Sequence, residues 1–252
     1  MFPVASLAFV GGIVAGSFVG VVAHRLPRGL SIVGPRSVCD SCDTQIAAYD
    51  NVPVFSWLLL RGHCRSCDAA IPVRYPLVEL AVGVAFAATA VVFRHDPAQL
   101  ALGLLFVTIL AAITLTDLER RVIPNVILLA GAIAGVAVVA ATDPSSLSDR
   151  GIAAAAAGGL LLAFAVAYPR GMGMGDVKLA AVMGLYLGVS MAPALLIAVL
   201  VGTVAGTGVM LTHGTGARKV GVPFGPFLAL GGVIALLVGP ELIDWYLNAF
   251  VR

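Results

Sequence analysis

Residues 100–117 read LALGLLFVTILAAITLTD, a mostly apolar run whose one charged residue is Asp117 at its end. A helix that crosses a bilayer needs about 20 mostly apolar residues, so this stretch predicts a transmembrane helix over residues 98–116. The whole chain has the same character, because 60% of its 252 residues are hydrophobic and only 11% are charged. Soluble domains carry about 25% charged residues. The composition therefore predicts that most of the protein surface faces lipid rather than water.

Similar stretches recur along the chain and predict an all-α polytopic membrane protein with about eight transmembrane helices. The first stretch is followed, not preceded, by basic residues, which favours a retained span over a cleaved signal peptide. The sixth stretch is the shortest. The predicted spans are 4–23, 76–93, 98–116, 122–141, 151–168, 178–190, 192–211 and 221–239.

The distribution of basic residues predicts the orientation of these spans. Cytoplasmic loops collect lysine and arginine. Both termini are therefore expected outside, with segment 24–75 in the cytoplasm, and the net charge of only +2 gives no indication of a nucleic-acid partner. All 15 lysines and arginines except Arg94, Arg150 and Arg252 fall in the loops of one side, which are 24–75, 117–121, 169–178 and 212–220.

Segment 24–75 is the one predicted soluble unit, and it contains all four cysteines. About 50 residues are too few for a stable core without a staple. Cys39-x-x-Cys42 and Cys64-x-x-Cys67 form two knuckles of the kind that present four thiolates to tetrahedral zinc. Such a shell has no open position, so the zinc would be structural. Two disulfides, which a reducing cytosol disfavours, and redox-active or free thiols are the alternatives.

Three acidic residues stand close to the predicted cytoplasmic boundary, namely Glu79, Asp117 and Asp176. Acids in or beside spans are costly and usually functional. Asp117 closes the third span and Asp176 lies just before the sixth, so the topology brings both to one membrane face. Two carboxylates that share a water can hydrolyse a peptide, which predicts Asp117 and Asp176 as a catalytic pair. The alternatives are an ion pair of Asp117 with Arg120 or Arg121, and a helix N-cap role for Asp176.

Residues around these acids give a predicted substrate-binding set. Gly173 and Gly175 lack side chains where a substrate strand must approach, and they permit unusual backbone angles. Lys178 is expected either to act on the carboxylate pair or a substrate carbonyl, or to be an ordinary positive-inside residue. Glu79 either pairs with Arg74 or helps to build a substrate site. The predicted set is Gly173, Gly175, Lys178, Glu79, Pro223 and Gly225.

Other glycines and prolines give expectations about the helices themselves. Gly12, Gly16 and Gly20 lie four residues apart, as do Gly202 and Gly206, a spacing that lets helix backbones approach closely in lipid. Pro223 and Pro226 bracket Phe224 and Gly225 at the start of the last span. Broken backbone at membrane depth is tolerated where protein or water satisfies it, so we expect a bent entry lining the active-site cavity, with a plain loop as the alternative.

Several motifs in the right order resemble the type IV prepilin peptidases, which are bacterial inner-membrane aspartyl peptidases of the GxGD type. Gly20 departs from the family pattern, which has Asn there, and Asp40 stands where Pro usually follows the first cysteine. The two cysteine knuckles match the zinc domain of that family. The other matching motifs are Gly16-Ser17-Phe18, His24-Arg25-Leu26-Pro27, Asp50-Asn51-Val52-Pro53, Leu58-Leu59-Leu60-Arg61-Gly62, Arg74-Tyr75-Pro76-Leu77-Val78-Glu79, Gly173-Met174-Gly175-Asp176-Val177-Lys178-Leu179 and Pro223-Phe224-Gly225-Pro226.

The resemblance implies a substrate and a reaction. The family removes the short basic leader from type IV prepilins or type II secretion pseudopilins, typically after Gly and before Phe, and many members then N-methylate the new N-terminus with S-adenosylmethionine. The implied domains are a first helix over 1–23, a zinc domain over 24–75 and a seven-helix peptidase domain over 76–252. Peptidase activity without methylation stays open at this point.

Two hypotheses from other functional classes also stay open. One is a proton-coupled transporter, although transporters hold their carboxylates near the bilayer midplane and often show inverted repeats, whereas both acids here fall at one boundary. The other is a membrane scaffold that binds a partner through the zinc knuckles, which leaves the two acids on one face unexplained.

Overall fold

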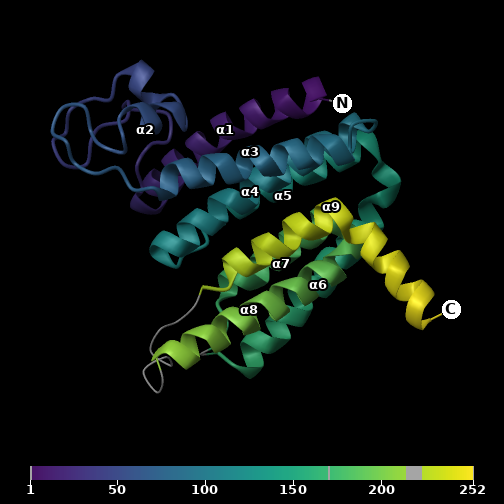
Figure 1. Cartoon of the computed structure of the whole chain (residues 1–252). Coiled ribbons are helices and arrows are strands. Elements are labelled where there is room, and N and C mark those ends of the chain that lie inside the picture. Colours follow the sequence, from purple (N-terminus) through teal and green to yellow (C-terminus); the bar gives the residue numbers. More distant parts are fainter. Residues whose placement is uncertain (1, 170, 214–222, 252) are drawn as a thin grey trace. The chain divides into compact units, whose positions relative to one another are not determined.

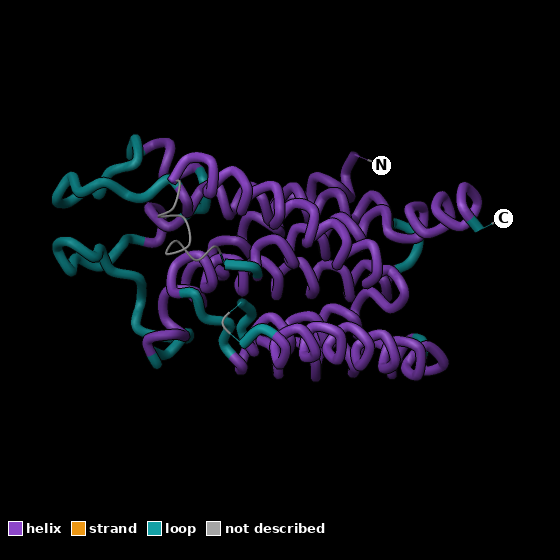
Figure 2. Tube along the Cα trace, turned by 90° about the horizontal axis from the view of Figure 1, so that it is seen from below, coloured by secondary structure: helices purple, strands orange, loops and turns teal. Residues whose placement is uncertain are grey.

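The computed structural model describes residues 2–169, 171–213 and 223–251 (Figure 1). These residues form helices and connecting loops, with two isolated β-bridges in the loops and no strand among them (Figure 2). The chain divides into two compact units, Met1–Arg94 and His95–Arg252.

The first unit consists of two long helices and the cysteine-containing segment between them. Its elements are α1 (Phe2–Arg25), η1 (Leu26–Arg28), η2 (Ala48–Asn51), α2 (Phe55–Leu59) and α3 (Arg74–Val92). α1 packs along α3. A Cβ atom at Gly12 would lie 2.8 Å from Cα of Gly83, and one at Gly16 would lie 2.7 Å from Cα of Glu79. The predicted close approach of backbones is confirmed at these two glycines, whereas Gly20 makes only ordinary contact, at 3.6 Å.

The described residues of the second unit form a bundle of six long helices. Its elements are α4 (Pro97–Arg120), α5 (Asn125–Thr142), η3 (Pro144–Ser146), α6 (Leu147–Ala167), α7 (Met174–Leu187), η4 (Gly188–Ser190), α8 (Met191–His213) and α9 (Gly225–Phe250). α4 packs against α5 and α9, α6 against α7, and α8 against α9. Phe106 of α4, Met183 of α7 and Leu228 of α9 are fully buried where these helices meet.

α7 is fixed at its C-terminal end by polar contacts as well as packing. The Arg150 guanidinium on α6 donates to the carbonyl oxygens of Leu185 at 3.2 Å and Tyr186 at 2.6 Å, which satisfies the terminal carbonyls of the helix. The Tyr186 ring stacks on Phe106 with 4.9 Å between centroids, and its hydroxyl donates to the Gly131 carbonyl at 2.6 Å. These contacts hold α7 against α4, α5 and α6.

The prediction of about eight membrane helices is confirmed, because the described residues contain eight long apolar helices. Seven described segments are long and apolar enough to cross a membrane, and one of them, Met174–Thr212, contains both α7 and α8. α7 begins at Met174, four residues before the predicted start at 178. Asp176 therefore lies inside the first turn of this helix, and the expectation that it precedes the helix is wrong.

The last helix is longer than predicted and is bent. The predicted span 221–239 ends where α9 kinks, at Val238 with φ −137° and before Pro240, and the helix then continues to Phe250 (Figure 1). A proline inside a helix removes one backbone hydrogen bond and clashes with the preceding turn, which accounts for the kink. The beginning of the predicted span at 221 lies outside the described residues.

Two further sequence expectations concern loops and helix contacts. The residues Arg170, Arg218 and Lys219, which supported the orientation, lie outside the described residues. A Cβ atom at Gly202 would lie 3.4 Å from the Phe227 ring, whereas one at Gly206 would have no described atom within 4 Å. The expected close approach is therefore absent at Gly206 in the part of the chain that the structure describes.

Candidate active site and metal centre

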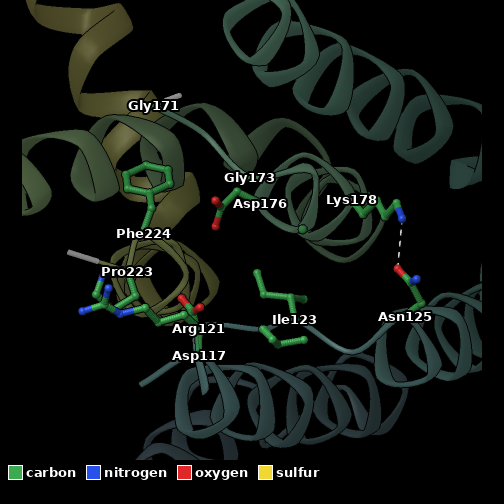
Figure 3. Close-up of a pocket in the computed structure, with 12 residues that line it drawn as sticks. Asp117, Arg121, Ile123, Asn125, Gly171, Gly173, Asp176, Lys178, Pro223 and Phe224 are labelled. Atoms are coloured by element: carbon green, nitrogen blue, oxygen red, sulfur yellow. Dashed lines mark hydrogen bonds between the residues drawn. The ribbon is translucent and has the colours of Figure 1, made fainter. Parts of the chain in front are cut away.

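A pocket of about 490 Å³ opens in the second unit, where the end of α4 faces the beginning of α7 (Figure 3). It brings together six of the predicted site residues, Asp117, Asp176, Gly173, Gly175, Lys178 and Pro223. The full lining is Asp117, Arg121, Val122, Ile123, Asn125, Gly171, Gly173, Gly175, Asp176, Lys178, Pro223 and Phe224.

Asp117 occupies the last turn of α4, and only 6% of it is exposed. The helix ends because Arg121 adopts a left-handed conformation with φ 54°, and the Arg121 amide donates to the Asp117 carbonyl at 2.8 Å. The Asp117 carboxylate accepts a hydrogen bond from the Gly225 amide at 3.1 Å. Among the described residues no ion pair joins Asp117 to Arg120 or Arg121, although Arg121 is near enough to act on it electrostatically. The structure therefore does not support the surface ion-pair alternative.

Asp176 reaches the same pocket from the first turn of α7. The N-cap of α7 is Gly173, so the predicted alternative of an Asp176 N-cap is wrong. Figure 3 shows the carboxylates of Asp117 and Asp176 pointing toward each other across the pocket, and the two groups interact electrostatically. Two facing carboxylates are the kind of pair that aspartic peptidases use, in which the two groups share one proton and hold a water between them.

Gly173 and Gly175, which precede Asp176 in the sequence, line the pocket without side chains. Gly173 has φ −81° and ψ 147°, and Gly175 is helical, so neither needs the backbone freedom of glycine, contrary to expectation. A Cβ atom at Gly175 would approach the Ile123 Cβ to 3.0 Å, whereas one at Gly173 would make ordinary contact with Asp176 Oδ2, at 3.5 Å. Gly173 and Gly175 therefore matter because they lack a side chain, and not because they adopt unusual backbone angles.

Lys178 lines the pocket but does not point at the carboxylates. Its ammonium donates to Asn125 Oδ1 at 3.0 Å, and Figure 3 shows the side chain directed toward that residue. Sequence reasoning missed Asn125 as a site residue, because only folding brings the first residue of α5 beside α7. Pro223 and Phe224 line the pocket as expected of a cavity entry, while Gly225 is buried behind Asp117.

Glu79 belongs to the first unit and joins its parts. Its carboxylate accepts a hydrogen bond from the Val54 amide at 2.7 Å and another from the Ser17 side chain. Val54 has φ 63°, which is strained for a β-branched residue. Glu79 thus holds a strained loop of the cysteine segment against α1 and α3.

The four cysteines converge, with their sulfur atoms within 4.8 Å of one another. The Cys39 and Cys67 sulfurs are 3.8 Å apart, far longer than a disulfide bond of about 2.05 Å. A zinc tetrahedron with bonds of about 2.3 Å has sulfur-to-sulfur edges of about 3.8 Å. The four free thiols therefore fit a tetrahedral metal site.

Local hydrogen bonds give these thiols different acidities in the absence of metal. The side chain and backbone of Thr44 lower the pKa of Cys42 to about 7. A backbone hydrogen bond from Ala69 acts in the same direction on Cys67, but burial and the neighbouring thiols outweigh it and raise the pKa of Cys67 to about 12. A proton held within the cluster is what a bound metal would displace.

An ion pair links the second knuckle to η2. Arg65 donates to both carboxylate oxygens of Asp50, at 2.8 and 2.6 Å, and its guanidinium lies 5.5 Å from the centroid of the Tyr49 ring. The hydrogen bond and charge of Arg65 lower the pKa of Asp50. Asp50 therefore remains ionised, and paired, throughout the neutral pH range.

Each of the two units contains residues that match the model of a known protein family. Residues 10–93 match the family model of the bacterial peptidase A24 N-terminal domain, and residues 104–211, which include Asp117 and Asp176, match that of the type IV leader peptidase family. The chain belongs to the type IV leader peptidase family. This membership confirms the resemblance that the sequence motifs indicated.

Relatives in the type IV leader peptidase family match this chain along nearly its full length. The prepilin leader peptidase/N-methyltransferase of Aeromonas hydrophila is 36% identical, over 98% of this chain and 94% of the relative. The protein of the same name from Bacillus subtilis is 35% identical, over 96% and 98%. The type 4 prepilin-like proteins leader peptide-processing enzyme of Escherichia coli is 34% identical, over 91% and 92%. No solved structure matches the chain.

Proposed function

We propose that this chain is a membrane aspartyl endopeptidase that removes the basic leader peptide from type IV prepilins or type II secretion pseudopilins. The observation that carries the proposal is the meeting of Asp117 and Asp176 in one pocket at the ends of α4 and α7. The names of relatives aligned along nearly the whole chain support the same activity. The position of Asp117 and Asp176 at helix ends also argues against a proton-coupled transporter, because transporters hold their acidic residues near the middle of the bilayer.

In the proposed mechanism a water lies between the two carboxylates. The ionised carboxylate takes a proton from the water as the water attacks the scissile carbonyl, while the protonated partner hydrogen-bonds to the carbonyl oxygen. The departing amine then receives a proton from the pair. Gly173 and Gly175 line the pocket without side chains, which would let the substrate backbone approach the carboxylates. Cleavage after Gly and before Phe is the expected junction, and alignment of that junction supplies much of the rate.

The first experiment is mass spectrometry of a prepilin co-expressed with the wild-type protein, Asp117→Asn or Asp176→Asn. We expect leader removal with the wild type and none with either variant, because an amide neither accepts the water proton nor exchanges protons with its partner. Thermal unfolding of the purified variants checks that both are folded. Cleavage by a folded Asp117→Asn or Asp176→Asn variant would contradict the proposal.

We also propose that the protein N-methylates the new N-terminus, with S-adenosylmethionine as the methyl donor and second substrate. The support is the double name, leader peptidase/N-methyltransferase, that several relatives carry. The same mass spectra test this step, since a methylated pilin should be heavier than a merely cleaved one by the mass of one CH2 group. Loss of the leader without this mass gain would support the proposed peptidase activity and contradict the proposed methyltransferase activity.

The remaining proposals concern the metal and the membrane. Cys39, Cys42, Cys64 and Cys67 would hold one zinc ion, which would stabilise the cytoplasmic segment and take no part in the chemistry, because four thiolates fill its shell. The bias of basic residues supports an orientation with both termini outside and the active site at the cytoplasmic face. The resemblance to bacterial inner-membrane peptidases supports an inner-membrane location.

A further inference from the structure

The Asp117 carboxylate is held by a residue from the far end of the sequence. The backbone amide of Gly225, the first residue of α9, donates to Asp117 Oδ2 at 3.1 Å across a sequence separation of 108 residues. Both groups belong to the second unit and are buried, Asp117 being 6% exposed. The hydrogen bond is therefore buried, and a buried hydrogen bond is electrostatically stronger than one in water.

The start of α9 offers this amide because its other first-turn donors are used or missing. The amides of Phe227 and Leu228 both donate to the Phe224 carbonyl, at 3.0 and 3.1 Å. Pro226 has no amide proton. A helix normally has four amides without intrahelical partners at its start. Here the Gly225 amide is the first-turn donor left over, and it is directed at Asp117.

The absence of a side chain at Gly225 is needed for the same contact. A Cβ atom at this position would lie 2.6 Å from Asp117 Oδ2 and 3.3 Å from Asp117 Cγ. Carbon and oxygen do not approach so closely, so any other residue at 225 would push the carboxylate away.

We propose that Gly225 is the positioning residue of the catalytic pair, holding Asp117 through one oxygen so that the other faces Asp176. A carboxylate fixed in this way is oriented by backbone, which cannot rotate as a side-chain donor would. The inference reassigns Gly225 from a substrate contact to a support of the reacting group. The effect on the reaction rests on the proposed function. The hydrogen bond between Gly225 and Asp117 does not depend on that proposal.

The kinetic test uses the full-length protein in detergent with a purified prepilin, comparing the wild type with Gly225→Ala. Misplacing a reacting group by about 1 Å can cost about 100-fold in rate. We expect kcat to fall by about that factor with KM little changed, and the pH–rate profile to shift because the environment of Asp117 has changed.

The matched control is Gly232→Ala on the same helix, where a Cβ atom would press on Met183 Cε at 2.8 Å and Leu110 Cδ1 at 3.0 Å. This variant introduces a similar clash away from the pocket. It should lower the unfolding temperature but keep the wild-type pH profile and a kcat within a few-fold. If Gly225→Ala keeps the wild-type kcat and pH profile while the Asp117→Asn and Asp176→Asn variants are inactive, the positioning role is overturned and the proposed function stands.

A second test does not depend on any substrate. Gly225→Ala should lower the unfolding temperature in the wild-type background but have little effect in Asp117→Ala, because the colliding carboxylate is then gone. An equal loss in both backgrounds would overturn the contact. If the wild type processes no prepilin, the proposed function fails, and this double-mutant cycle still decides whether Gly225 holds Asp117.

Discussion

Two glycines adjoin the carboxylate pair for different reasons. At Gly225 an added Cβ would collide with Asp117 Oδ2, whereas at Gly173 it would make ordinary contact with Asp176 Oδ2 at 3.5 Å. Gly173 also has backbone angles open to any residue. The protein itself therefore tolerates a methyl group at Gly173, and a requirement for glycine there must come from the substrate.

The prediction at the residue scale is that Gly173→Ala folds normally but cleaves poorly. Because the methyl group would occupy space lining the pocket, we expect kcat/KM for a prepilin to fall roughly tenfold or more, mainly through KM, with the unfolding temperature unchanged. Steady-state cleavage assays and thermal unfolding measure the two quantities. Gly159→Ala on α6, where a Cβ atom has no described neighbour within 4 Å, is the control. An unchanged kcat/KM in Gly173→Ala would show that this glycine does not adjoin the substrate.

The sequence indicated which acidic side chains meet in the pocket, but not which groups hydrogen-bond to the pocket residues and hold them in place. Asp117 and Asp176 stood out because acids are rare beside apolar spans. The role of Gly225 carried no such signal, because its donor is a backbone amide present in every residue except proline. The partner of Lys178 was equally hidden, since Asn125 lies on another helix.

At the scale of single elements, hydrophobicity located the centres of the helices but not their ends. α7 begins at Met174 and includes Gly175, Asp176 and Lys178 in its first turns, which a search for apolar residues assigns to a loop. The end of α4 is set by the left-handed Arg121, a conformation that its residue type does not indicate. Both helix ends matter because each carries one carboxylate of the pair.

The prediction for the cysteine segment concerns the Asp50–Arg65 ion pair, which ties η2 to the knuckle of Cys64 and Cys67. Asp50→Asn should speed zinc release to a chelator, because the second knuckle loses a bidentate restraint. The pKa of Asp50 is lowered in the folded protein. Ionised Asp50 therefore stabilises the cysteine segment fully at any pH above the usual pKa of aspartate, and this stabilisation is lost only as the pH falls through the lowered pKa. The difference between variant and wild type should therefore be constant between about pH 6 and pH 8.

Release rates are read from a coloured zinc chelator added to the purified, zinc-loaded protein. Asp149→Asn, a substitution of an acid on α6 in the other unit, is the control and should match the wild type. Equal release from Asp50→Asn and wild type would mean that the ion pair does not support the metal site.

At the scale of the whole molecule, the four-cysteine cluster and the carboxylate pair lie in different units. Contacts divide the chain after Arg94, because α3 packs along α1, and the predicted domain limits of 1–23, 24–75 and 76–252 remain a prediction. Composition was sufficient to predict an all-helical membrane protein of about eight helices. The division into units was not predictable from it, because the pairing of α1 with α3 depends on glycine contacts between helices.

The predicted orientation is a property of the whole chain and has a direct test. Alkaline phosphatase is active only outside the cytoplasm, so a fusion after Arg252 should be active and fusions within 24–75 inactive, with a green fluorescent protein series giving the opposite pattern. The physical reason is the excess of lysine and arginine in one set of loops. An inactive C-terminal phosphatase fusion in a stably expressed protein would reverse the orientation or change the number of spans.

The hydrogen bond from Gly225 to Asp117 also affects how the protein comes into being. Ribosomes deliver the chain from its N-terminus, so α4 and α7, which carry the two aspartates, are synthesised before α9. A nascent chain at that stage already contains both reactive groups but lacks the amide that orients one of them. Full cleavage activity would then depend on synthesis of the last helix, and a chain truncated before α9 would lack the amide that orients Asp117.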